Sequence, residues 1–488
     1  MGWGGGQLTM EQPIAVEFTL EELRALFPEV KAEWLGSGGR IRGISTDSRR
    51  VLPGSVFVAL RGSRVDAHTR LAEAFAAGAA MAIVEQRSWR QFPADWQRFP
   101  CVPVVNPLQA LGQLARLHRL RFRIPVVAVV GSAGKTTTKE LIAAVLARRF
   151  RVLSTPGNFN NQLGVPLTLL QLRPEHQVAV VELGTNSFGE IARLVQIACP
   201  THGVVTALGA EHLEFLGSVD GVVQEETALL RALRDTGGMA ILPAWEPALR
   251  QYHSERTLWF GLSAAPDVVV WAESIQPRAF PMPVRLSYGG ALSMLELRLP
   301  GQIGVRAAAA AAAVAWALGV DAESVVGALS EFAPESAHGY ARMAIEHIPP
   351  GVTVLNDTYN ANPLSMHMAL QVLQDFPARG RRIAVLGDML ELGAAAEAAH
   401  REVLEHAQRV AEWVFVLGEQ FRACAHGQPK VCVCSTHEEA LQRLQEVLQP
   451  GDVVLLKGSR GMRMEAIVEQ WRRQADAVPS DAVDLAHL

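Results

Sequence analysis

Short, mostly apolar runs recur along the chain after residue 125, and each ends in glycine or polar residues. These runs lie at 126–130, 178–181, 203–205, 352–355, 383–386 and 453–456. Between them, apolar residues return with the spacing of amphipathic helices. Buried strands that alternate with helices are typical of parallel sheets. The pattern therefore predicts an α/β protein with two doubly wound sheets, the second smaller than the first.

A further α/β unit precedes these two. Strands are expected at 51–60 and 81–84 around a helix at 72–77, and a helix at 108–121 leads into the next unit. A chain of 488 residues is also longer than one hydrophobic core usually organises. We therefore expect three domains, at 1–104, 105–334 and 335–488. Seven consecutive alanines at 307–313 predict a further, closely packed helix.

Composition narrows the classes of function. A net charge of −4 argues against a general nucleic-acid binder, so any site for an anion must be local. Five scattered cysteines suit a reducing compartment. The N-terminus lacks the basic and apolar regions of a signal peptide, and the apolar run at 307–320 is too short to span a bilayer. We expect a cytoplasmic protein without membrane insertion or nucleic-acid partners, acting as a monomer.

The stretch at 126–140 combines a strand, a glycine loop and the start of a helix. Gly131-Ser132-Ala133-Gly134 is followed by Lys135, Thr136 and Thr137. Backbone N–H groups at such a helix start bind phosphate, the lysine reaches the terminal phosphates, and the threonine hydroxyl can hold Mg²⁺. The spacing falls short of the full Walker pattern because the first glycine comes late. The alternative is an ordinary glycine turn before a helix with a surface lysine.

Two strand ends carry further candidate residues. Glu182 closes the run at 178–181, and His212 follows the run at 203–205. Ligands bind at the carboxyl ends of the strands in an open α/β sheet, so Glu182 is a candidate metal ligand near the phosphates. A lone surface acid and a structural histidine are the alternatives. A helix is expected at 222–233, with Glu225 and Glu226 near its start favouring the helix dipole.

Polar loops elsewhere could bind substrate. Asp47-Ser48-Arg49 puts a hydroxyl and a guanidinium at a strand end, where they could hold a phosphate or a uracil edge, although a solvated loop explains them equally well. The segment at 155–166 is too rich in glycine, proline and amides for a regular element. The loop at 356–363 is rich in donors and acceptors. It ends one strand of the C-terminal unit, whose loops could present substrate to the glycine loop.

Taken together, these motifs resemble the Mur ligases of bacterial cell-wall synthesis over nearly the whole chain. The matching pieces are Asp47-Ser-Arg49, the glycine loop through Glu140, Gly157-Asn-Phe-Asn-Asn161, Glu182-Leu-Gly184, His212-Leu-Glu214, Asp357-Thr-Tyr-Asn-Ala-Asn-Pro363, Gly387-Asp-Met-Leu-Glu-Leu-Gly393 and Lys457-Gly-Ser-Arg460. The pieces at 357–363 and 387–393 are most similar to the branch that adds D-alanyl-D-alanine.

The resemblance implies an ATP- and Mg²⁺-dependent, ADP-forming amide ligase. Such an enzyme phosphorylates the terminal carboxylate of a UDP-N-acetylmuramoyl-tripeptide, and D-Ala-D-Ala then attacks the acyl phosphate, a step in peptidoglycan precursor synthesis. Two other interpretations stay open. The chain could be a divergent paralogue with another amine or muropeptide substrate, or a nucleotide-binding scaffold with weak catalysis.

The resemblance also implies roles for individual residues. Lys135, Glu182, His212, Glu226 and Arg342 are the expected catalytic residues, and Thr136, Glu182, His212 and Glu226 the ligands of two Mg²⁺ ions. The nucleotide would be bound by residues 131–137 with Arg342, Asp357 and Asn360. The other substrates would be bound by Asp47, Ser48, Arg49, Asn158, Asn161, Tyr359, Asn362, Lys457, Ser459 and Arg460. For Arg342 to reach the phosphates, the domains must close about a hinge near residue 334.

The chain departs from the family in several places. Mur ligases usually carry a carbamylated lysine after the histidine motif, but no lysine occurs between Leu141 and Pro429. Glu226 aligns with that position, so Glu226, or its neighbour Glu225, is expected to supply the carboxylate directly. The family's adenine-contacting His-Asn pair and second Asn are replaced by Ile303, Gly304 and Ala307. Selectivity for adenine is therefore in doubt.

Overall fold

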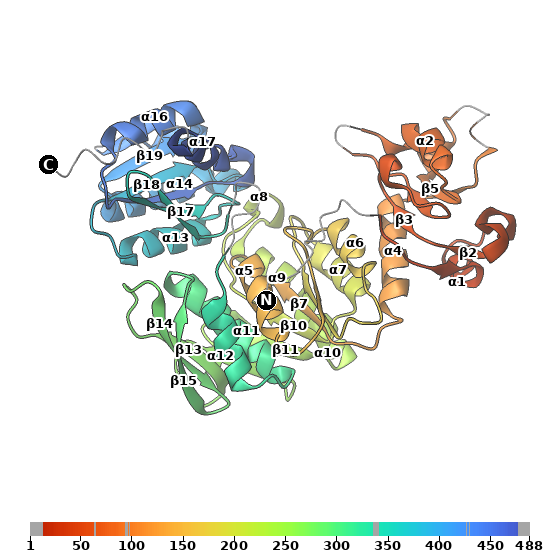
Figure 1. Ribbon diagram of the computed structural model, residues 1–488, viewed down its shortest axis with the longest axis horizontal. Coiled ribbons are helices and arrows are strands. Elements are labelled where there is room, and N and C mark those ends of the chain that lie inside the picture. Colours follow the sequence, from red (N-terminus) through yellow and green to blue (C-terminus); the bar gives the residue numbers. More distant parts are fainter. Residues whose placement is uncertain are drawn as a thin grey trace.

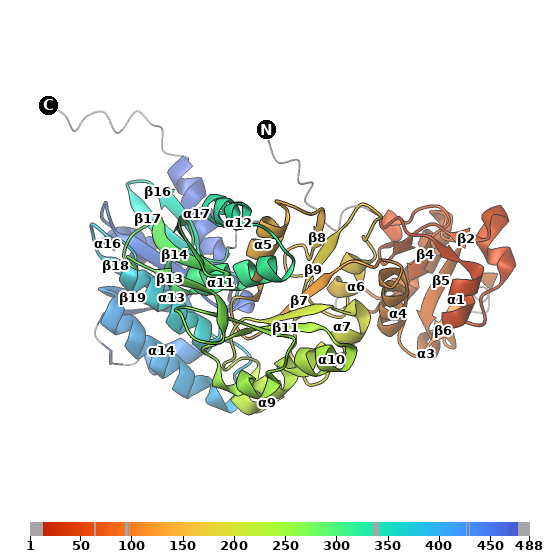
Figure 2. The same ribbon diagram turned by 90° about the horizontal axis from the view of Figure 1, so that it is seen from below.

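Three lobes follow one another along the chain in the computed structural model, which describes residues 13–476 except 63, 64, 93–95, 97, 335–340, 426 and 429 (Figure 1). We call them the N-terminal, central and C-terminal units. The central unit lies between the other two in both views (Figures 1 and 2). The segment of the expected hinge beyond residue 334 lies outside the described residues. The α/β class and the three-unit organisation are confirmed.

The N-terminal unit contains a four-stranded sheet of order β3-β4-β5-β6, in which all neighbours are parallel. A small antiparallel pair, β1 with β2, lies beside it. The elements are β1 (Phe18–Thr19), α1 (Leu20–Leu26), β2 (Arg40–Ile41), β3 (Ile44–Ser45), β4 (Val56–Val58), α2 (Leu71–Ala76), β5 (Met81–Glu85), α3 (Gln86–Trp89) and β6 (Cys101–Val104). Helix α4 (Pro107–Arg119) then leads into the central unit.

The central unit is built on a nine-stranded sheet of order β15-β14-β13-β12-β11-β10-β7-β9-β8. Its strands are β7 (Val126–Val130), β8 (Val152–Ser154), β9 (Val178–Glu182), β10 (His202–Val205), β11 (Met239–Pro243), β12 (Thr257–Gly261), β13 (Val268–Ser274), β14 (Met282–Tyr288) and β15 (Ala291–Leu297). Its helices are α5 (Lys135–Leu146), α6 (Gly164–Leu169), α7 (Glu190–Ala198), α8 (Leu213–Leu216), α9 (Val219–Glu226), α10 (Ala228–Thr236), α11 (Gly301–Ala317) and α12 (Ala322–Glu331).

The central sheet differs from the expected parallel sheet at one edge. Neighbouring strands among β7 to β13 all pair in parallel. Strands β14 and β15 form a hairpin that continues the sheet beyond β13 with antiparallel pairing. Side chains in β14 alternate largely between buried and more exposed positions, because helices cover one of its faces. The prediction of a single helix at 222–233 is wrong. The chain forms α9 and α10 with Thr227 between them, so Glu225 and Glu226 end a helix instead of opening one.

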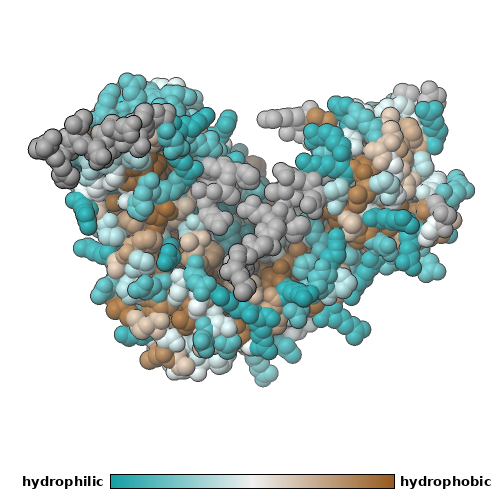
Figure 3. All heavy atoms as spheres, viewed as in Figure 1, coloured by the Kyte–Doolittle hydropathy of each residue, from teal (hydrophilic) through white to brown (hydrophobic). Residues whose placement is uncertain are grey.

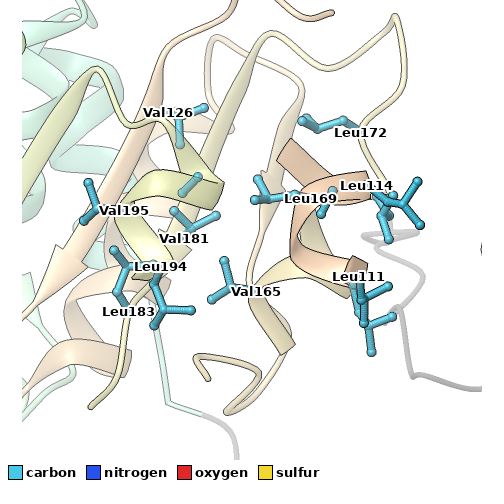
Figure 4. Close-up of a cluster of buried hydrophobic side chains, with 14 of the residues drawn as sticks. Leu111, Leu114, Val126, Val165, Leu169, Leu172, Val181, Leu183, Leu194 and Val195 are labelled. Atoms are coloured by element: carbon cyan, nitrogen blue, oxygen red, sulfur yellow. The ribbon is translucent and has the colours of Figure 1, made fainter. Parts of the chain in front are cut away.

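Two apolar layers hold the central sheet. On one side, Leu111 and Leu114 of α4 face Val165 and Leu169 of α6, and all four side chains are buried (Figure 4). This layer is continuous with the core of the N-terminal unit, which attaches that unit to the central one. On the other side, α11 and its seven alanines pack against α5 and the sheet, as the alanine run predicts. Both layers position the residues that follow the carboxyl ends of β7, β9 and β10.

The C-terminal unit has a six-stranded sheet of order β16-β17-β21-β18-β19-β20, parallel except for the edge pair β16 with β17. Its strands are β16 (Ala344–Ile348), β17 (Val352–Asp357), β18 (Arg382–Gly387), β19 (Trp413–Leu417), β20 (Val431–Cys434) and β21 (Val453–Lys457). Its helices are α13 (Pro363–Asp375), α14 (Ala396–Val410), α15 (Glu419–Cys424), α16 (His437–Val447) and α17 (Glu465–Asp476).

Hydrophilic side chains cover much of the outer face of the C-terminal unit that Figure 3 shows. Among the described residues, no helix is long and apolar enough to cross a bilayer.

Candidate active site

The glycine loop at 131–134 connects β7 to α5 and is held by the end of β10. Gly131 has a φ of 128°, and a Cβ on it would lie 2.8 Å from the carbonyl oxygen of Ala207. Ser132 donates its backbone N–H to the same carbonyl oxygen at 2.7 Å. The Ser132 hydroxyl also donates to the carbonyl of Gly209 at 3.0 Å. A side chain at position 131 therefore does not fit, and the loop is preshaped for a close ligand.

Lys135 opens α5, and its ammonium turns back over the glycine loop. Nζ donates to the carbonyl oxygen of Gly131 and lies 3.5 Å from Oε2 of Glu211. Burial disfavours the charged form, but the carboxylates of Glu211, Glu226 and Glu182 outweigh it, and the pKa of Lys135 is raised. Lys135 thus keeps a positive charge inside the site.

Thr136 and Glu182 form a buried pair beneath the loop. The Thr136 hydroxyl donates to Oε2 of Glu182 at 2.7 Å, and the Asn160 side-chain amide donates to Oε1 at 2.8 Å. Asn160 belongs to the polar loop at 155–166, whose neighbouring Asn161 caps the start of α6 by accepting from the N–H of Gly164. Asn158 lies exposed on the same loop. Glu182 is therefore oriented by both a helix start and a loop.

His212 joins the central and C-terminal units. It has a φ of 47°, in the left-handed region, and directly precedes α8. Its Nδ1 lies 2.5 Å from Oε2 of Glu391, and its Nε2 lies 4.0 Å from Oε2 of Glu211. A histidine that donates Nδ1–H to a carboxylate leaves the lone pair of Nε2 available. Strained backbone at such a position is typical of functional residues.

Glu226 is the last residue of α9, and its side chain contacts the glycine loop. It is fully buried, and its Oε2 accepts the backbone N–H of Gly131 at 2.9 Å. Burial, together with the neighbouring Glu211 carboxyl, raises its pKa to about 8 against the opposing charge of Lys135. Glu225 caps the neighbouring α7 by accepting the N–H of Ile191 at 2.7 Å.

The C-terminal unit presents a cation and an amide to the loop. The Arg342 guanidinium lies 3.9 Å from the centre of the Tyr359 ring. Asn362 caps α13 and donates its side-chain N–H to the carbonyl oxygen of Ser132 at 3.0 Å. The Arg342 charge also acts on the pKa of Lys135, lowering it. Arg342 and Lys135, from two units, thus face the same space.

Behind this face, Lys457 fixes the loop that follows β17. Its Nζ donates to Oδ2 of Asp357 at 2.6 Å and to the carbonyl oxygen of Asn360 at 2.8 Å. Ser459 donates its hydroxyl to the carbonyl of Ala361, and Arg460 pairs with Glu465 at 2.8 Å. Since Lys457 is buried, these bonds order the loop that carries Tyr359 and Asn362.

One cavity of about 250 Å³ brings most of the predicted residues together. Its lining includes Ser132, Ala133, Gly134, Lys135, Thr137, Asn160, Asn161, Glu182, Glu211, His212, Arg342, Asp357, Tyr359, Asn360, Asn362 and Lys457. A smaller cavity of about 180 Å³ shares Glu211 and His212 and adds Glu391, Ser459 and Arg460. Glu226 and Asn158 are outside both linings.

The predicted residues of the N-terminal unit line a separate cavity of about 840 Å³. Asp47 binds Arg49 through both carboxylate oxygens, at 2.9 and 2.7 Å, and this hydrogen bonding lowers its pKa. Ser48 donates to Glu73 at 3.1 Å. The opposite wall comes from the central unit, where it includes Arg173 and His176. This cavity is therefore open to a ligand that touches two units.

The oxygen atoms at the glycine loop fit a divalent cation. A hydroxyl and a carboxylate, as Thr136 and Glu182 supply, are ligands that Mg²⁺ prefers. Oε1 of Glu211 and Oε1 of Glu226 are both buried. The Glu211 carboxyl is close enough to hydrogen-bond to Glu226, and this contact helps to raise the pKa of Glu226. The described residues contain no group of three or more His, Cys, Asp or Glu side chains arranged as a complete metal centre. Phosphate oxygens would have to complete the shell, as is usual for Mg²⁺.

Comparison with known proteins decides the family. Three Mur ligase models match, described as the "Mur ligase family, catalytic domain" at residues 40–119, the "Mur ligase middle domain" at 129–315 and the "Mur ligase, glutamate ligase domain" at 341–460. A UDP-N-acetylmuramoyl-tripeptide–D-alanyl-D-alanine ligase of Bacillus subtilis is 31% identical over 437 residues, 88% of this chain and 93% of the relative. This chain belongs to the Mur ligase family.

Solved Mur ligases share the whole fold. A crystal structure of MurF from Acinetobacter baumannii has a TM-score of 0.82 at 31% identity, covering 94% of this Mur ligase and 100% of the other chain. The MurF ligase of Thermotoga maritima, solved in complex with ADP, has a TM-score of 0.77 at 28% identity, covering 89% and 97%. The three-unit architecture is therefore common to this Mur ligase and its relatives.

The departures from the family pattern lie beside the glycine loop. Ile303 and Ala307, on the first turns of α11, line a cleft of about 10 Å³ against Ala133 and Gly134. Arg306 lies in the same lining, with its guanidinium 5.0 Å from the centre of the Trp245 ring. Its Nε is buried without a hydrogen-bond partner. The side chains that line this cleft in this Mur ligase are thus mostly apolar.

Sequence reasoning missed three residues of the site in this Mur ligase: Asn160, Glu211 and Glu391. Asn160 and Glu211 stand next to predicted residues, Asn161 and His212, so their position in the sequence was a usable signal. Glu391 lies in a motif that resembles the family, but its contact with His212 spans 179 positions. A local pattern carries no information on such a contact.

Proposed function

We propose that this Mur ligase joins D-Ala-D-Ala to UDP-N-acetylmuramoyl-tripeptide with hydrolysis of ATP to ADP and phosphate. The observation that carries the proposal is the shared cavity, where Lys135 of the central unit and Arg342 of the C-terminal unit face the same space above the glycine loop. Two cations beside a preshaped loop suit a transferring phosphoryl group. The names of the relatives supply the substrates.

In the first step, a carboxylate oxygen of the tripeptide attacks the γ-phosphorus of ATP. A bond forms between them as the bond to the β–γ bridging oxygen breaks, and ADP leaves. The N–H groups of the glycine loop and Lys135 would hold the phosphates, and Arg342 would neutralise the charge that develops on the transferred group. The Tyr359 ring beneath the guanidinium keeps Arg342 in position.

In the second step, the amine of D-Ala-D-Ala forms a bond to the acyl carbon. The carbon–oxygen bond to phosphate breaks, phosphate leaves, and the nitrogen gives up a proton to solvent. The cavity shared by His212, Ser459 and Arg460 adjoins the phosphate site and suits the incoming dipeptide. The enzyme contributes mainly by holding the reactants together.

Mg²⁺ would be held by Thr136 and Glu182, with His212 and Glu226 available for a second ion. When bound, Mg²⁺ neutralises phosphate oxygens and makes phosphoryl transfer easier. Asp357 and Asn360 would lie toward the ribose. Asp47, Ser48 and Arg49 would bind the UDP end in the N-terminal cavity. Asn161, Tyr359, Asn362 and Lys457 would shape the substrate side, and Asn158 would act from the loop rim.

The proposed domains keep the bounds 1–104, 105–334 and 335–488, and their support is that each range contains one large sheet. We propose that the enzyme acts as a monomer, because one chain supplies both the glycine loop with Lys135 and the opposing Arg342 that the proposed chemistry needs. Sedimentation of the purified protein tests this, and a stable dimer would contradict it.

Phosphate release tests the function. Purified protein is mixed with Mg-ATP, UDP-N-acetylmuramoyl-tripeptide and D-Ala-D-Ala, and each component is left out in turn. The expected result is release only in the complete mixture, with the pentapeptide product identified by mass spectrometry. Release with another amine or muropeptide in place of these substrates would indicate a divergent paralogue. Nucleotide binding without release for any amine would indicate a scaffold.

A further inference from the structure

Lys139 carries a buried positive charge that the proposed chemistry does not use. It lies on α5 four residues after Lys135, and only 3% of its side chain is exposed. It is absent from the linings of both cavities beside the glycine loop. Its ion pair with Glu140 is long, at 3.5 Å, and the Glu140 side chain is exposed. Burial of an ammonium is unfavourable unless strong partners replace water, so other groups must account for this charge.

The ammonium binds the polar loop at 155–161 through two backbone carbonyl groups. Nζ donates to the carbonyl oxygen of Thr155 at 2.9 Å and lies 3.4 Å from that of Gly157. Gly157 has a φ of 51°, so the chain turns through the left-handed region at this point. A charged donor that contacts both sides of a turn stabilises that turn over other conformations. Lys139 thus ties the loop to the helix that begins at the glycine loop.

The same loop holds Glu182 in place. The Thr155 hydroxyl accepts the backbone N–H of Glu182 at 3.0 Å, and the Asn160 side-chain amide donates to Oε1 of Glu182 at 2.8 Å. The carbonyl oxygen of Asn160 also accepts the backbone N–H of Gly184 at 2.8 Å. Oε2 of Glu182 then accepts the Thr136 hydroxyl at 2.7 Å. The direction of this carboxylate therefore depends on how the loop is held.

Lys457 has a comparable arrangement in the C-terminal unit. Its buried ammonium donates to Asp357 and to the carbonyl oxygen of Asn360, and these bonds order the loop after β17. Residues of this loop and of the loop at 155–161 line the same cavity as Lys135. A buried lysine thus holds each of two loops that meet at the candidate active site.

We propose that Lys139 is a positioning residue for phosphoryl transfer, whose ammonium holds the loop at 155–161 in the conformation in which Asn160 orients Glu182. The inference rests on the proposed function and adds a residue to it. Lys139 itself contacts neither nucleotide nor acceptor. When its charge is removed, the turn at Gly157 loses its charged donor, and Asn160 no longer keeps Oε1 of Glu182 in place.

Phosphate release in the complete reaction mixture tests this role. Lys139→Met keeps the length of the side chain and removes its charge. It is expected to lower kcat about 10- to 100-fold, the range found for outer partners of functional carboxylates. Lys139→Arg can still donate to both carbonyl groups and should recover part of the loss. Glu140→Gln, which removes the exposed acid beside the ammonium, is the matched control and is expected to stay within about twofold of wild type.

A double-mutant cycle separates positioning from a general effect on the fold. If Lys139 acts through Asn160, Lys139→Met should lower kcat by less than a further factor of about two in a chain that already carries Asn160→Ala. A lysine with a merely structural role would lower kcat by the same factor in both backgrounds, and that result would overturn the inference. If Lys139→Met does not fold, Lys139→Gln takes its place in the cycle.

ADP affinity without Mg²⁺ separates this inference from the proposed function. Lys139→Met is expected to bind ADP within about twofold of wild type, because the glycine loop and Lys135 are unchanged. Loss of ADP binding in this variant would show a broader structural role and overturn the inference, as would a wild-type kcat. Either result leaves the proposed function intact if wild type releases phosphate. Absence of release from wild type would overturn the proposed function, and this inference with it.

Discussion

The carboxylate of Glu391 lies 2.5 Å from Nδ1 of His212, although the two residues belong to different units of the chain. The carbonyl oxygen of Glu391 also accepts the backbone N–H of Glu214, in the first turn of α8, at 3.2 Å. Both contacts connect the loop after β18 to the central unit. Contact between the units therefore also fixes the direction of the His212 ring.

Removal of the Glu391 carboxylate should reduce activity without removing nucleotide binding. Glu391→Ala is expected to lower kcat about 10- to 100-fold, because outer partners of a ligating histidine have effects of this size. Glu391→Gln keeps an acceptor oxygen and should recover part of the loss. Glu397→Ala, at an exposed acid of α14, is the control. Wild-type kcat in Glu391→Ala would show that the histidine needs no such partner.

The Tyr359 ring should contribute to activity through its stacking with the Arg342 guanidinium. The Arg342 guanidinium lies 3.9 Å from the ring centre. Stacking of this kind is worth about 1 to 2 kcal/mol, which corresponds to about a 5- to 30-fold change in rate. Tyr359→Ala is expected to lose that factor in phosphate release, and Tyr359→Phe, which keeps the ring, is expected to be faster than Tyr359→Ala. Equal rates for the two variants would speak against the stacked role.

Discrimination between purine nucleotides should be weak. Ile303, Gly304 and Ala307 carry no side-chain donor or acceptor, and strong selection of a polar base edge needs one. Competition binding is expected to show ATP preferred over GTP by less than about tenfold. Ile303→His restores a polar group beside the loop and should raise that preference, whereas Ile303→Leu should leave it unchanged. A thousandfold preference of the wild type for ATP over GTP would mean that another side chain recognises the base, and Arg306 would be the first candidate.

Acid should destabilise the contact between α4 and α6 through His118. This ring is buried, its Nε2 lies 3.0 Å from the carbonyl oxygen of Leu172, and burial lowers its pKa to about 4. The folded pKa is below the unfolded value of 6.5, so the unfolded chain binds the proton more readily. The stability is present above pH 6.5 and is lost as the pH falls toward 4.

Urea unfolding at two pH values measures this effect. Between pH 7 and pH 5, wild type is expected to lose about 2 kcal/mol of unfolding free energy more than His118→Gln, in which nothing titrates at this position. His347→Gln, at an exposed histidine of β16, is the control and should follow wild type. The same loss in wild type and His118→Gln would mean that other groups cause the acid sensitivity.

Much of the site followed from local patterns and one rule of topology. Lys135 and Thr136 were predictable because a strand, a glycine loop and a helix start lie next to each other in sequence. Glu182 and His212 were predictable because the carboxyl ends of parallel strands meet at one edge. The position of Glu226 could not be predicted in this way. It depends on where helix α9 ends, and α9 ends at Glu226 with Thr227 as its C-cap.

The remaining misses have a similar origin. The hairpin of β14 and β15 follows no glycine–strand–helix repeat, and its alternating pattern on a half-exposed edge is weaker than that of a buried strand. Glu211 and Glu391 carry side chains that are ordinary by composition. Glu211 gains Lys135 as a partner only because the segment after β10 folds over the start of α5, and Glu391 gains His212 only because two units meet. Sequence spacing does not encode either approach.

The alanine face of α11 has a mechanical consequence. In seven consecutive positions, at 307–313, this helix has no side chain larger than a methyl group, and all seven are buried where α11 packs on α5, the sheet and the neighbouring helices. Short side chains have no alternative rotamers into which they could yield, so the spacing between the two helices is stiff. Because α5 begins at Lys135, the glycine loop at 131–134 is held at a fixed position relative to the central sheet. Movement during turnover then falls to the C-terminal unit.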